Sequence, residues 1–255
     1  MRLSVSGLIA ATLLAALALP AQAAPFECRP ATMTQSASLP GLSVLPSVQG
    51  RALDILAIGS SSTEGVGASS KAKTYPARLK AYLEQAWPKT KINIVNAGIG
   101  GETAPETLVR LEKALGERRF DLVIWQVGTN DAVTGGNLET FKALLSRGID
   151  IAQQARTGIV LLDQQFYPNI KDLQRYRGFV TAVAETAQAR KVPVLSRFKV
   201  MSDWYSRDVA AFGAVLSGDG FHMSDVGYEC LARDMAASLV GLAGTAQPVF
   251  AQAAR

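Results

Sequence analysis

The chain has 255 residues, of which 48% are hydrophobic and 18% are charged, with 26 Lys and Arg against 21 Asp and Glu. The positive charges are scattered, without a Lys/Arg-rich run or a basic stripe interleaved with aromatic residues, which argues against nucleic-acid binding. A length of this order lies within the range of a single α/β domain with a substantial core.

The first residues are typical of a secretory signal. Arg2 precedes an apolar run from Leu8 to Leu19, and Ala21-Gln22-Ala23 follows it. This order of charged, apolar and small residues is shared by export signals. The apolar run is shorter than the roughly 20 residues that span a bilayer. We therefore expect residues 1–23 to be removed, and the mature protein to be exported to the periplasm or secreted without stable membrane insertion.

The rest of the chain divides into three parts. Residues 24–51 are rich in Ser, Pro, Thr and Gly and predict an extended lead-in. Residues 52–243 form the expected domain, in which short apolar runs alternate with amphipathic segments, and residues 244–255 predict a flexible tail. The runs are almost continuously apolar, as strands buried on both faces are. They are Leu53–Ile58, Ile92–Val95, Leu122–Val127, Ile159–Leu162 and Val192–Leu195.

Residues typical of helix boundaries occur between these runs. Pro suits the first turn of a helix, Asn and Ser suit the N-cap, and Gly suits the end. They are Pro76, Pro105, Asn137, Gly158 and Ser224. Gly158 is expected to end the helix that Asn137 begins, and another helix is expected from about residue 173 to 190. The alternation predicts an α/β fold, a three-layer doubly wound, mainly parallel five-stranded sheet with helices on both faces.

Small polar clusters follow the first three runs. Gly59-Ser60-Ser61-Ser62-Thr63 follows the first run, a glycine-rich segment over residues 96–103 follows the second, and Gly128-Thr129-Asn130-Asp131 follows the third. Ligands of open α/β sheets bind beyond the carboxyl ends of the strands. The three clusters are therefore expected to converge on one site.

His222 is the only histidine of the chain, and it lies in Asp219-Gly220-Phe221-His222. A serine hydroxyl is a weak nucleophile until a base accepts its proton, and a neutral imidazole does so near neutral pH. Asp219 can reach the imidazole through one tight turn and fix its tautomer. Serine, glycine, asparagine and histidine thus occur in an order that can supply a nucleophile, oxyanion donors and a base.

In this order the motifs resemble those of the SGNH hydrolases, also called the GDSL esterase/lipase family. The resemblance extends from about Asp54 to the region of Leu242. It implies the flavodoxin-like α/β fold of that family. One position departs from the family pattern, because Gly59-Ser60-Ser61 stands where the family has Gly-Asp-Ser.

The resemblance implies a role for each motif residue. It makes Ser61 the nucleophile, His222 the base and Asp219 the partner that orients the base. It assigns the oxyanion hole to the backbone N–H of Ser61, the backbone N–H of Gly101 and the side-chain amide of Asn130. These groups would bind the negative oxygen of a tetrahedral intermediate.

Each residue also has a purely structural interpretation. Residues 60–63 can form a polar turn or cap a helix, Gly101 can be a turn glycine, and Asn130 can form an Asx-turn. A phosphate-binding loop over residues 59–67 is disfavoured, since it lacks Gly-Lys-Ser/Thr and the Gly-x-Gly-x-x-Gly spacing. The ordered set as a whole favours acyl chemistry.

The resemblance implies an exported serine esterase that hydrolyses a short acyl or acetyl ester of a small molecule or glycan, without a metal or an organic cofactor. Two alternatives use the same residues. One is a transferase that passes the acyl group to a glycan hydroxyl, and the other is a degenerate member that binds an acylated glycan without turnover.

The two cysteines, Cys28 and Cys230, allow a disulfide in an oxidising compartment,. The sequence does not show whether they are close enough to pair, and a buried Cys230 with an unpaired Cys28 is the alternative. Neither has a CxxC partner or a neighbouring histidine, so no metal or redox site is predicted at either.

Overall fold

A computed structural model of the chain describes residues 26–27, 31, 33 and 51–243. The expected signal segment 1–23, most of the lead-in 24–51 and the expected tail 244–255 lie outside the described residues.

Five strands form one sheet in the order β2-β1-β3-β4-β5, and all four pairings are parallel. The strands are β1 (Leu53–Gly59), β2 (Ile92–Gly98), β3 (Leu122–Gln126), β4 (Gly158–Leu162) and β5 (Val194–Leu195). Every residue of β3 and β4 is buried, which is why their sequences, apart from Gln126 at the end of β3, are apolar on both faces rather than alternating. This arrangement confirms the predicted α/β class and the five-stranded parallel sheet.

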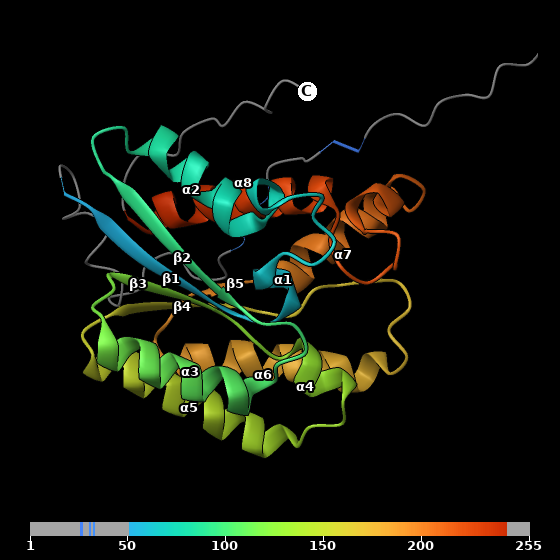
Figure 1. The fold of residues 1–255 in the computed structure, drawn as a ribbon. Coiled ribbons are helices and arrows are strands. Elements are labelled where there is room, and N and C mark those ends of the chain that lie inside the picture. Colours follow the sequence, from blue (N-terminus) through green and yellow to red (C-terminus); the bar gives the residue numbers. More distant parts are fainter. Residues whose placement is uncertain (1–25, 28–30, 32, 34–50, 244–255) are drawn as a thin grey trace, which may run out of the picture.

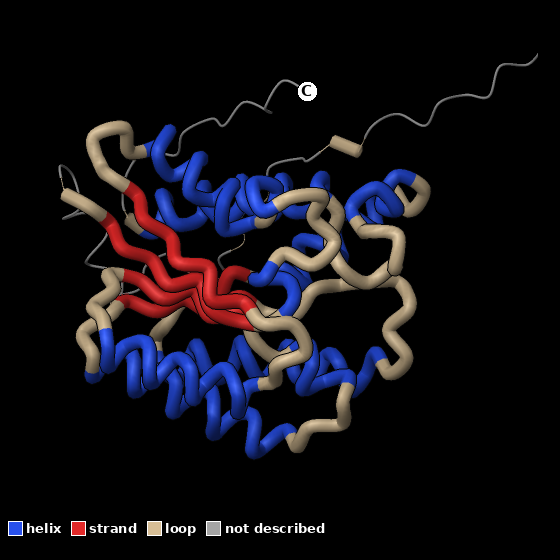
Figure 2. The backbone as a smooth tube through the Cα atoms, viewed as in Figure 1, coloured by secondary structure: helices blue, strands red, loops and turns tan. Residues whose placement is uncertain are grey.

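Helices cover both faces of the sheet, and Figure 2 shows the strands as the middle layer. In Figure 1, one face is covered by α2 and α8 and the other by α3, α5 and α6. The helices are α1 (Ser61–Glu64), α2 (Tyr75–Ala86), α3 (Ala104–Glu117), α4 (Thr129–Val133), α5 (Leu138–Gln154), α6 (Leu173–Arg190), α7 (Arg197–Arg207) and α8 (Asp225–Leu242). Short 3-10 helices, η3 and η4, span Lys71–Lys73 and Ala211–Val215.

Neighbouring residues of each strand pack into opposite cores, as the pleat requires. Ile55 and Ile124 belong to the core beneath α2 and α8. Leu56 and Trp125 belong to the core beneath α3, α5 and α6. The sheet is therefore held from both sides, and its carboxyl edge is a rigid platform for the polar clusters.

Most of the predicted helix starts are confirmed. The Asn137 side chain accepts a hydrogen bond from the N–H of Thr140 at 2.9 Å, and the Ser224 hydroxyl accepts one from the N–H of Gly227 at 3.3 Å. Pro76 and Pro105 lie in the first turns of α2 and α3.

Two predicted boundaries are wrong. Gly158 does not end α5 but is the first residue of β4; α5 ends at residue 154, and Arg156, with φ 55°, takes the left-handed position that reverses the chain. The expected strand Val192–Leu195 shortens to its last two residues. The N–H of Val192 donates back to the carbonyl of Ala187 in α6, and the following Pro193 has no N–H to donate.

No sequence pattern predicts α7, because the contact that begins it comes from a distant residue. Ser196 forms no side-chain cap. Instead Asp163, which follows β4, accepts hydrogen bonds from the N–H of Phe198 at 2.9 Å and the Ser196 hydroxyl at 2.7 Å. Asp163 is 1% exposed. Burial raises its pKa to about 6, against the lowering effect of these hydrogen bonds and of Arg197.

This raised pKa predicts a pH-dependent stability. Asp163 binds a proton more tightly in the folded chain, where its pKa is about 6, than in the unfolded chain, where its pKa has the ordinary value of 3.8. Its contribution therefore weakens folding as pH rises through that range, by about 3 kcal/mol in total. Asp163→Asn is neutral throughout, so its free energy of unfolding relative to the wild type should rise by about 2 kcal/mol of this total between pH 4 and pH 7. Urea denaturation at both pH values measures this.

An exposed variant, Asp203→Asn, serves as the control and should track the wild type at both pH values. If the free energies of unfolding of Asp163→Asn and the wild type differed by the same amount at pH 4 and pH 7, the raised pKa of Asp163 would be contradicted.

Cys230 lies in α8, is fully buried and is disulfide-bonded. The other cysteine of the sequence, Cys28, lies outside the described residues. Within the described part of the chain, no helix combines the length and apolar character needed to cross a membrane.

Candidate active site

The carboxyl ends of β2, β1 and β3 lie side by side, and they bring the three polar clusters together. The strand order reverses between β1 and β3, the switch point where ligands of such sheets bind. Gly98 permits α1 to lie directly on β2, because a Cβ at this position would lie 1.9 Å from the backbone nitrogen of Glu64. The Glu64 carboxylate then accepts from the N–H of Gly100 at 2.7 Å, which links the first cluster to the second.

Ser61, His222 and Asp219 form a continuous hydrogen-bonded chain. The Oγ of Ser61 lies 2.9 Å from Nε2 of His222, and Nδ1 of the same ring lies 2.6 Å from Oδ2 of Asp219. Ser61 is the first residue of α1, and the other two residues lie in the loop before α8. The structure thus brings together three residues that the sequence places 161 positions apart at the widest.

Asp219 is held as a carboxylate by its own loop. Its Oδ1 accepts from the N–H groups of Phe221 and His222, each at 2.9 Å, and from the Ser217 hydroxyl at 2.8 Å. Partial burial tends to raise the pKa of Asp219, but the hydrogen bonds from His222, Phe221 and Ser217 outweigh it and hold the pKa well below its usual range. A permanent negative charge at this position favours the imidazolium form of His222 when it takes a proton.

The neighbouring hydroxyls of the first cluster point away from His222. Ser60 is 4% exposed, and Gln126 at the end of β3 accepts from its N–H at 2.9 Å and exchanges a hydrogen bond with its hydroxyl at 3.2 Å. Thr63 donates to the same Gln126 oxygen at 3.1 Å. Ser62 is 2% exposed and donates to Gln165 at 2.8 Å. At the position where the SGNH pattern has Asp, the Ser60 hydroxyl is therefore satisfied by Gln126.

Three N–H donors were expected from the sequence to bind a ligand oxygen, namely the backbone N–H groups of Ser61 and Gly101 and the side-chain amide of Asn130. Within residues 51–243, no group accepts a hydrogen bond from the backbone N–H of Ser61 or Gly101. Gly101 has φ 83°, a left-handed conformation that favours glycine,. The amide of Asn130 donates to the carbonyl of Glu102 at 2.7 Å, which fixes its orientation and leaves its second N–H for a ligand.

Two further residues hold the second cluster in place, Asp131 of the third cluster and Arg110, which no sequence pattern singled out. Asp131 is 6% exposed and accepts from the N–H of Ala104 at 2.9 Å, so it anchors the start of α3 next to the second cluster. Burial raises its pKa, and this hydrogen bond opposes the rise. Arg110 pairs with Glu102 and donates to the carbonyl of Ala97 at 2.8 Å.

An aromatic row continues from the imidazole. The Phe221 ring packs edge-on against the His222 ring with centroids 4.8 Å apart, and Tyr167 packs edge-on against Phe221, also at 4.8 Å. Two aromatic rings thus lie in a row next to the imidazole.

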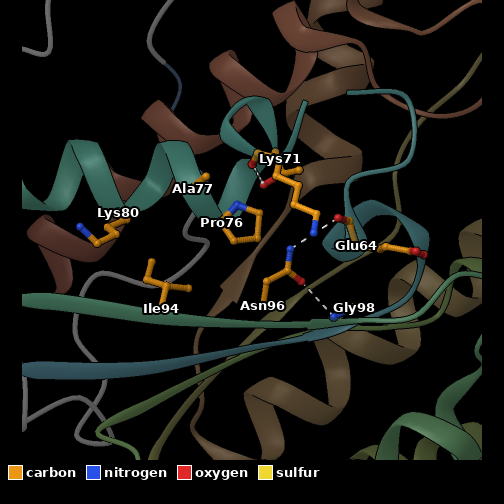
Figure 3. A pocket seen from close by; sticks show the side chains of 9 residues that line it. Glu64, Lys71, Pro76, Ala77, Lys80, Ile94, Asn96 and Gly98 are labelled. Atoms are coloured by element: carbon orange, nitrogen blue, oxygen red, sulfur yellow. Dashed lines mark hydrogen bonds between the residues drawn. The ribbon is translucent and has the colours of Figure 1, made fainter. Parts of the chain in front are cut away.

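A groove of about 520 Å³ opens beside α1, between α2 and the edge strand β2. Figure 3 shows Ile94 and Asn96 of β2 facing α2 across it. Its charged and polar lining includes Glu64, Lys71 and Lys80. In the part of the chain that the structure describes, no group of three or more His, Cys, Asp or Glu residues could hold a metal ion.

Residues 27–245 match the sequence profile of the non-GDSL lipase-like family. The chain belongs to this family. Its Ser60, in place of the GDSL aspartate, agrees with the family's description. The expected relationship to the SGNH, or GDSL esterase/lipase, hydrolases is confirmed by the family and by the fold.

The chain is similar to a curated arylesterase over part of its length. An arylesterase from Vibrio mimicus is 25% identical over 97 residues, which are 34% of this chain and 48% of the relative. The match therefore spans about half of that protein.

Among solved structures, a two-domain esterase active on acetylated mannans superposes with a TM-score of 0.65 at 21% identity, covering 82% of this chain and 53% of that one. TesA superposes with a TM-score of 0.62 at 22% identity, covering 74% of this chain and 98% of TesA. At such identities these similarities establish the fold.

Proposed function

We propose that the protein is a serine ester hydrolase that uses Ser61, His222 and Asp219. The observation that carries the proposal is the continuous chain of hydrogen bonds from Ser61 Oγ through the His222 ring to Asp219, next to N–H donors with no acceptor in the described chain. Nucleophile, base and orienting carboxylate in hydrogen-bond contact are the arrangement that acyl transfer requires.

The mechanism follows from this geometry. Ser61 Oγ attacks the ester carbonyl carbon while Nε2 of His222 takes its proton, and Asp219 stabilises the imidazolium that forms. The carbonyl oxygen becomes negative and is bound by the N–H groups of Ser61, Gly101 and Asn130. His222 then gives the proton to the departing alcohol, leaving an acyl group on Ser61. Water, activated by the same imidazole, releases the acid and restores the serine.

For the substrate, we propose a short acyl or acetyl ester of a polar alcohol such as a glycan. Support for a polar alcohol comes from the groove beside α1. Its lining does not include Ser61 or His222, but it contains Glu64 of α1 together with Lys71, Lys80 and Asn96. A long apolar acyl chain would leave these groups without solvent or hydrogen-bond partners, which is unfavourable.

The test is labelling of the purified protein with a fluorophosphonate probe, followed by a panel of esters with increasing acyl length and with small or saccharide alcohols. We expect labelling, and release of acid that is fastest for short acyl groups. Adding a sugar acceptor distinguishes a hydrolase from a transferase. A transferase would form a new ester of the sugar and release less free acid. Binding of acylated glycan without labelling or turnover would overturn the hydrolase proposal.

A role for Asn130 as oxyanion donor gives a kinetic prediction. Asn130→Ala should lower kcat by roughly 10²–10³ with little change in KM, because the lost hydrogen bond strengthens only as negative charge develops. Steady-state kinetics on a short ester measures both constants.

Asn137→Ala is the matched control. Asn137 caps α5 through the N–H of Thr140, so its loss should lower stability by about 1 kcal/mol and leave kcat unchanged. Asp131 is unsuitable as a control, since it anchors α3. Equal losses of kcat in Asn130→Ala and Asn137→Ala would count against a specific role for Asn130.

We also propose that the protein is exported and that residues 1–23 are its signal. Support comes from the order of Arg2, the apolar run and Ala21-Gln22-Ala23, and from a disulfide at Cys230, which suits an oxidising compartment. N-terminal sequencing of the protein recovered from a periplasmic or culture fraction tests this. A cytoplasmic protein that retains residues 1–23 would refute it.

A further inference from the structure

Gln165 connects the segment that carries Ser61 to the segment that carries His222. It follows β4 and is 0% exposed. Its Oε1 accepts a hydrogen bond from the Ser62 hydroxyl at 2.8 Å, and its Nε2 donates to the carbonyl of Phe221 at 2.8 Å. One side-chain amide therefore bonds the residue after Ser61 and the residue before His222.

The backbone of Gln165 is itself held by a buried side chain. Its backbone carbonyl accepts a hydrogen bond from the Tyr176 hydroxyl at 2.7 Å, and Tyr176 is a buried residue of α6. The side chain thus extends from a rigid part of the sheet edge. A rigid support is what keeps reacting groups within a fraction of an ångström of their working geometry.

Other bonds join the two segments only at a distance from the reacting atoms. The Tyr228 hydroxyl donates to the carbonyl of Val66 at 2.7 Å, and Asp225 accepts from the N–H of Ser69 at 2.8 Å. These contacts tie α8 to the loop after α1. Loss of Gln165 should therefore leave the segments docked but free to shift near Ser61 and His222.

We propose that Gln165 is a positioning residue that sets the separation between Ser61 Oγ and His222 Nε2. The inference rests on the proposed function of Ser61 and His222. An amide is required because the position needs one acceptor for Ser62 and one donor for the carbonyl of Phe221. A carboxylate could accept from Ser62 but would face that carbonyl without a proton to donate, and an alkyl group could do neither.

The adjacent Gln164 supplies a matched control. It is also 0% exposed, but neither its amide nitrogen nor its amide oxygen has a hydrogen-bond partner among the described residues. Gln164→Leu therefore makes the same chemical change one residue away without breaking a hydrogen bond of the site.

The experiment compares Gln165→Leu, Gln165→Glu, Ser62→Ala and Gln164→Leu with the wild type. We expect Gln165→Leu to lower kcat by about 10–10² with little change in KM, since a displacement of about 1 Å can cost that much. Gln165→Glu should also be impaired, and Gln164→Leu should keep the wild-type kcat. Gln165→Leu already removes the hydrogen bond between Gln165 and Ser62. The double variant Ser62→Ala/Gln165→Leu should therefore show no larger loss of kcat than Gln165→Leu alone.

A second readout does not need activity. The chain has one histidine, so ¹⁵N-labelled histidine gives a single imidazole spin system in the NMR spectrum. Gln165→Leu should shift its ring signals, and Gln164→Leu should leave them in place. A residue that only stabilised the fold would lower the unfolding temperature and leave these signals in place.

Folded Gln165→Leu with wild-type kcat and unchanged imidazole signals overturns the proposal. If Gln165→Leu does not fold, Ser62→Ala takes its place, because it removes only the hydroxyl that donates to Gln165. A wild-type kcat together with wild-type imidazole signals in Ser62→Ala would then overturn the proposal. Failure of the proposed function has a different signature: the wild type would neither label nor hydrolyse esters, while the imidazole signals would still respond to Gln165→Leu.

Discussion

Ser61→Ala is expected to lose fluorophosphonate labelling and to lower ester turnover by about 10⁴–10⁶, with the protein still folded. The expectation follows from the 2.9 Å contact between Ser61 Oγ and His222 Nε2. Alanine removes the only hydroxyl of the cluster that has this contact. The core should be unaffected, since the side chain is only partly buried and bonds no other group. Labelling, kinetics and circular dichroism measure the three quantities.

Ser60→Ala and Ser62→Ala are the controls for this result. Both hydroxyls are at most 4% exposed and are bonded to glutamines, so they cannot reach a substrate. Both variants should still become labelled, although more slowly where the serine turn is loosened. If Ser62→Ala were no longer labelled by the probe while Ser61→Ala still was, the nucleophile would be Ser62 and not Ser61.

His222→Gln is the second variant from which we expect a very large effect, a loss of turnover of about 10⁴–10⁶. Glutamine is close to imidazole in size and can still donate to Asp219, but it cannot accept the serine proton. The variant should remain folded by circular dichroism, because His222 lies in a loop at the edge of the sheet.

The pH dependence of kcat/KM separates His222 from other groups. Asp219 has a pKa held well below its usual range, so it stays ionised while activity falls on acidification. The acid limb should therefore not arise from Asp219, and it should be absent in a variant that lacks the base, since the chain has no other histidine,. A folded His222→Gln protein that keeps the wild-type profile would require a different base.

The meeting of the proposed site residues could be predicted from the sequence because the signals for them are local or ordered. Asp219 and His222 are three residues apart and bond within one turn. Ser61 and Asn130 each follow an apolar run, and parallel strands place their carboxyl ends at one edge. Sequence alone therefore indicated where the groups would meet, and the structure adds the distances and the hydrogen-bond partners.

The supporting residues could not be predicted, since their partners are distant along the chain. Gln126 bonds a serine 66 positions away, and Gln165 bonds a serine 103 positions away. One signal was present, because Gln126 interrupts an otherwise apolar run and Gln165 closely follows another. Polar side chains in such places must find partners when buried, but the sequence does not say which.

The same reason explains why the sequence did not predict helix α7 or the end of α5. Helix α7 depends on Asp163, more than thirty residues earlier in the chain, and the end of α5 depends on the backbone of Arg156 rather than on a glycine. In both cases a contact or conformation outside the local pattern decides the boundary.

The most direct test of a serine hydrolase centred on Ser61 is to locate the bound probe. After reaction of the wild-type protein with a fluorophosphonate, proteolysis and tandem mass spectrometry identify the modified residue. The proposed mechanism predicts one phosphonate adduct, on Ser61, with Ser60 and Ser62 unmodified. An adduct on any other residue, or ester hydrolysis by a protein that forms no adduct, would contradict it.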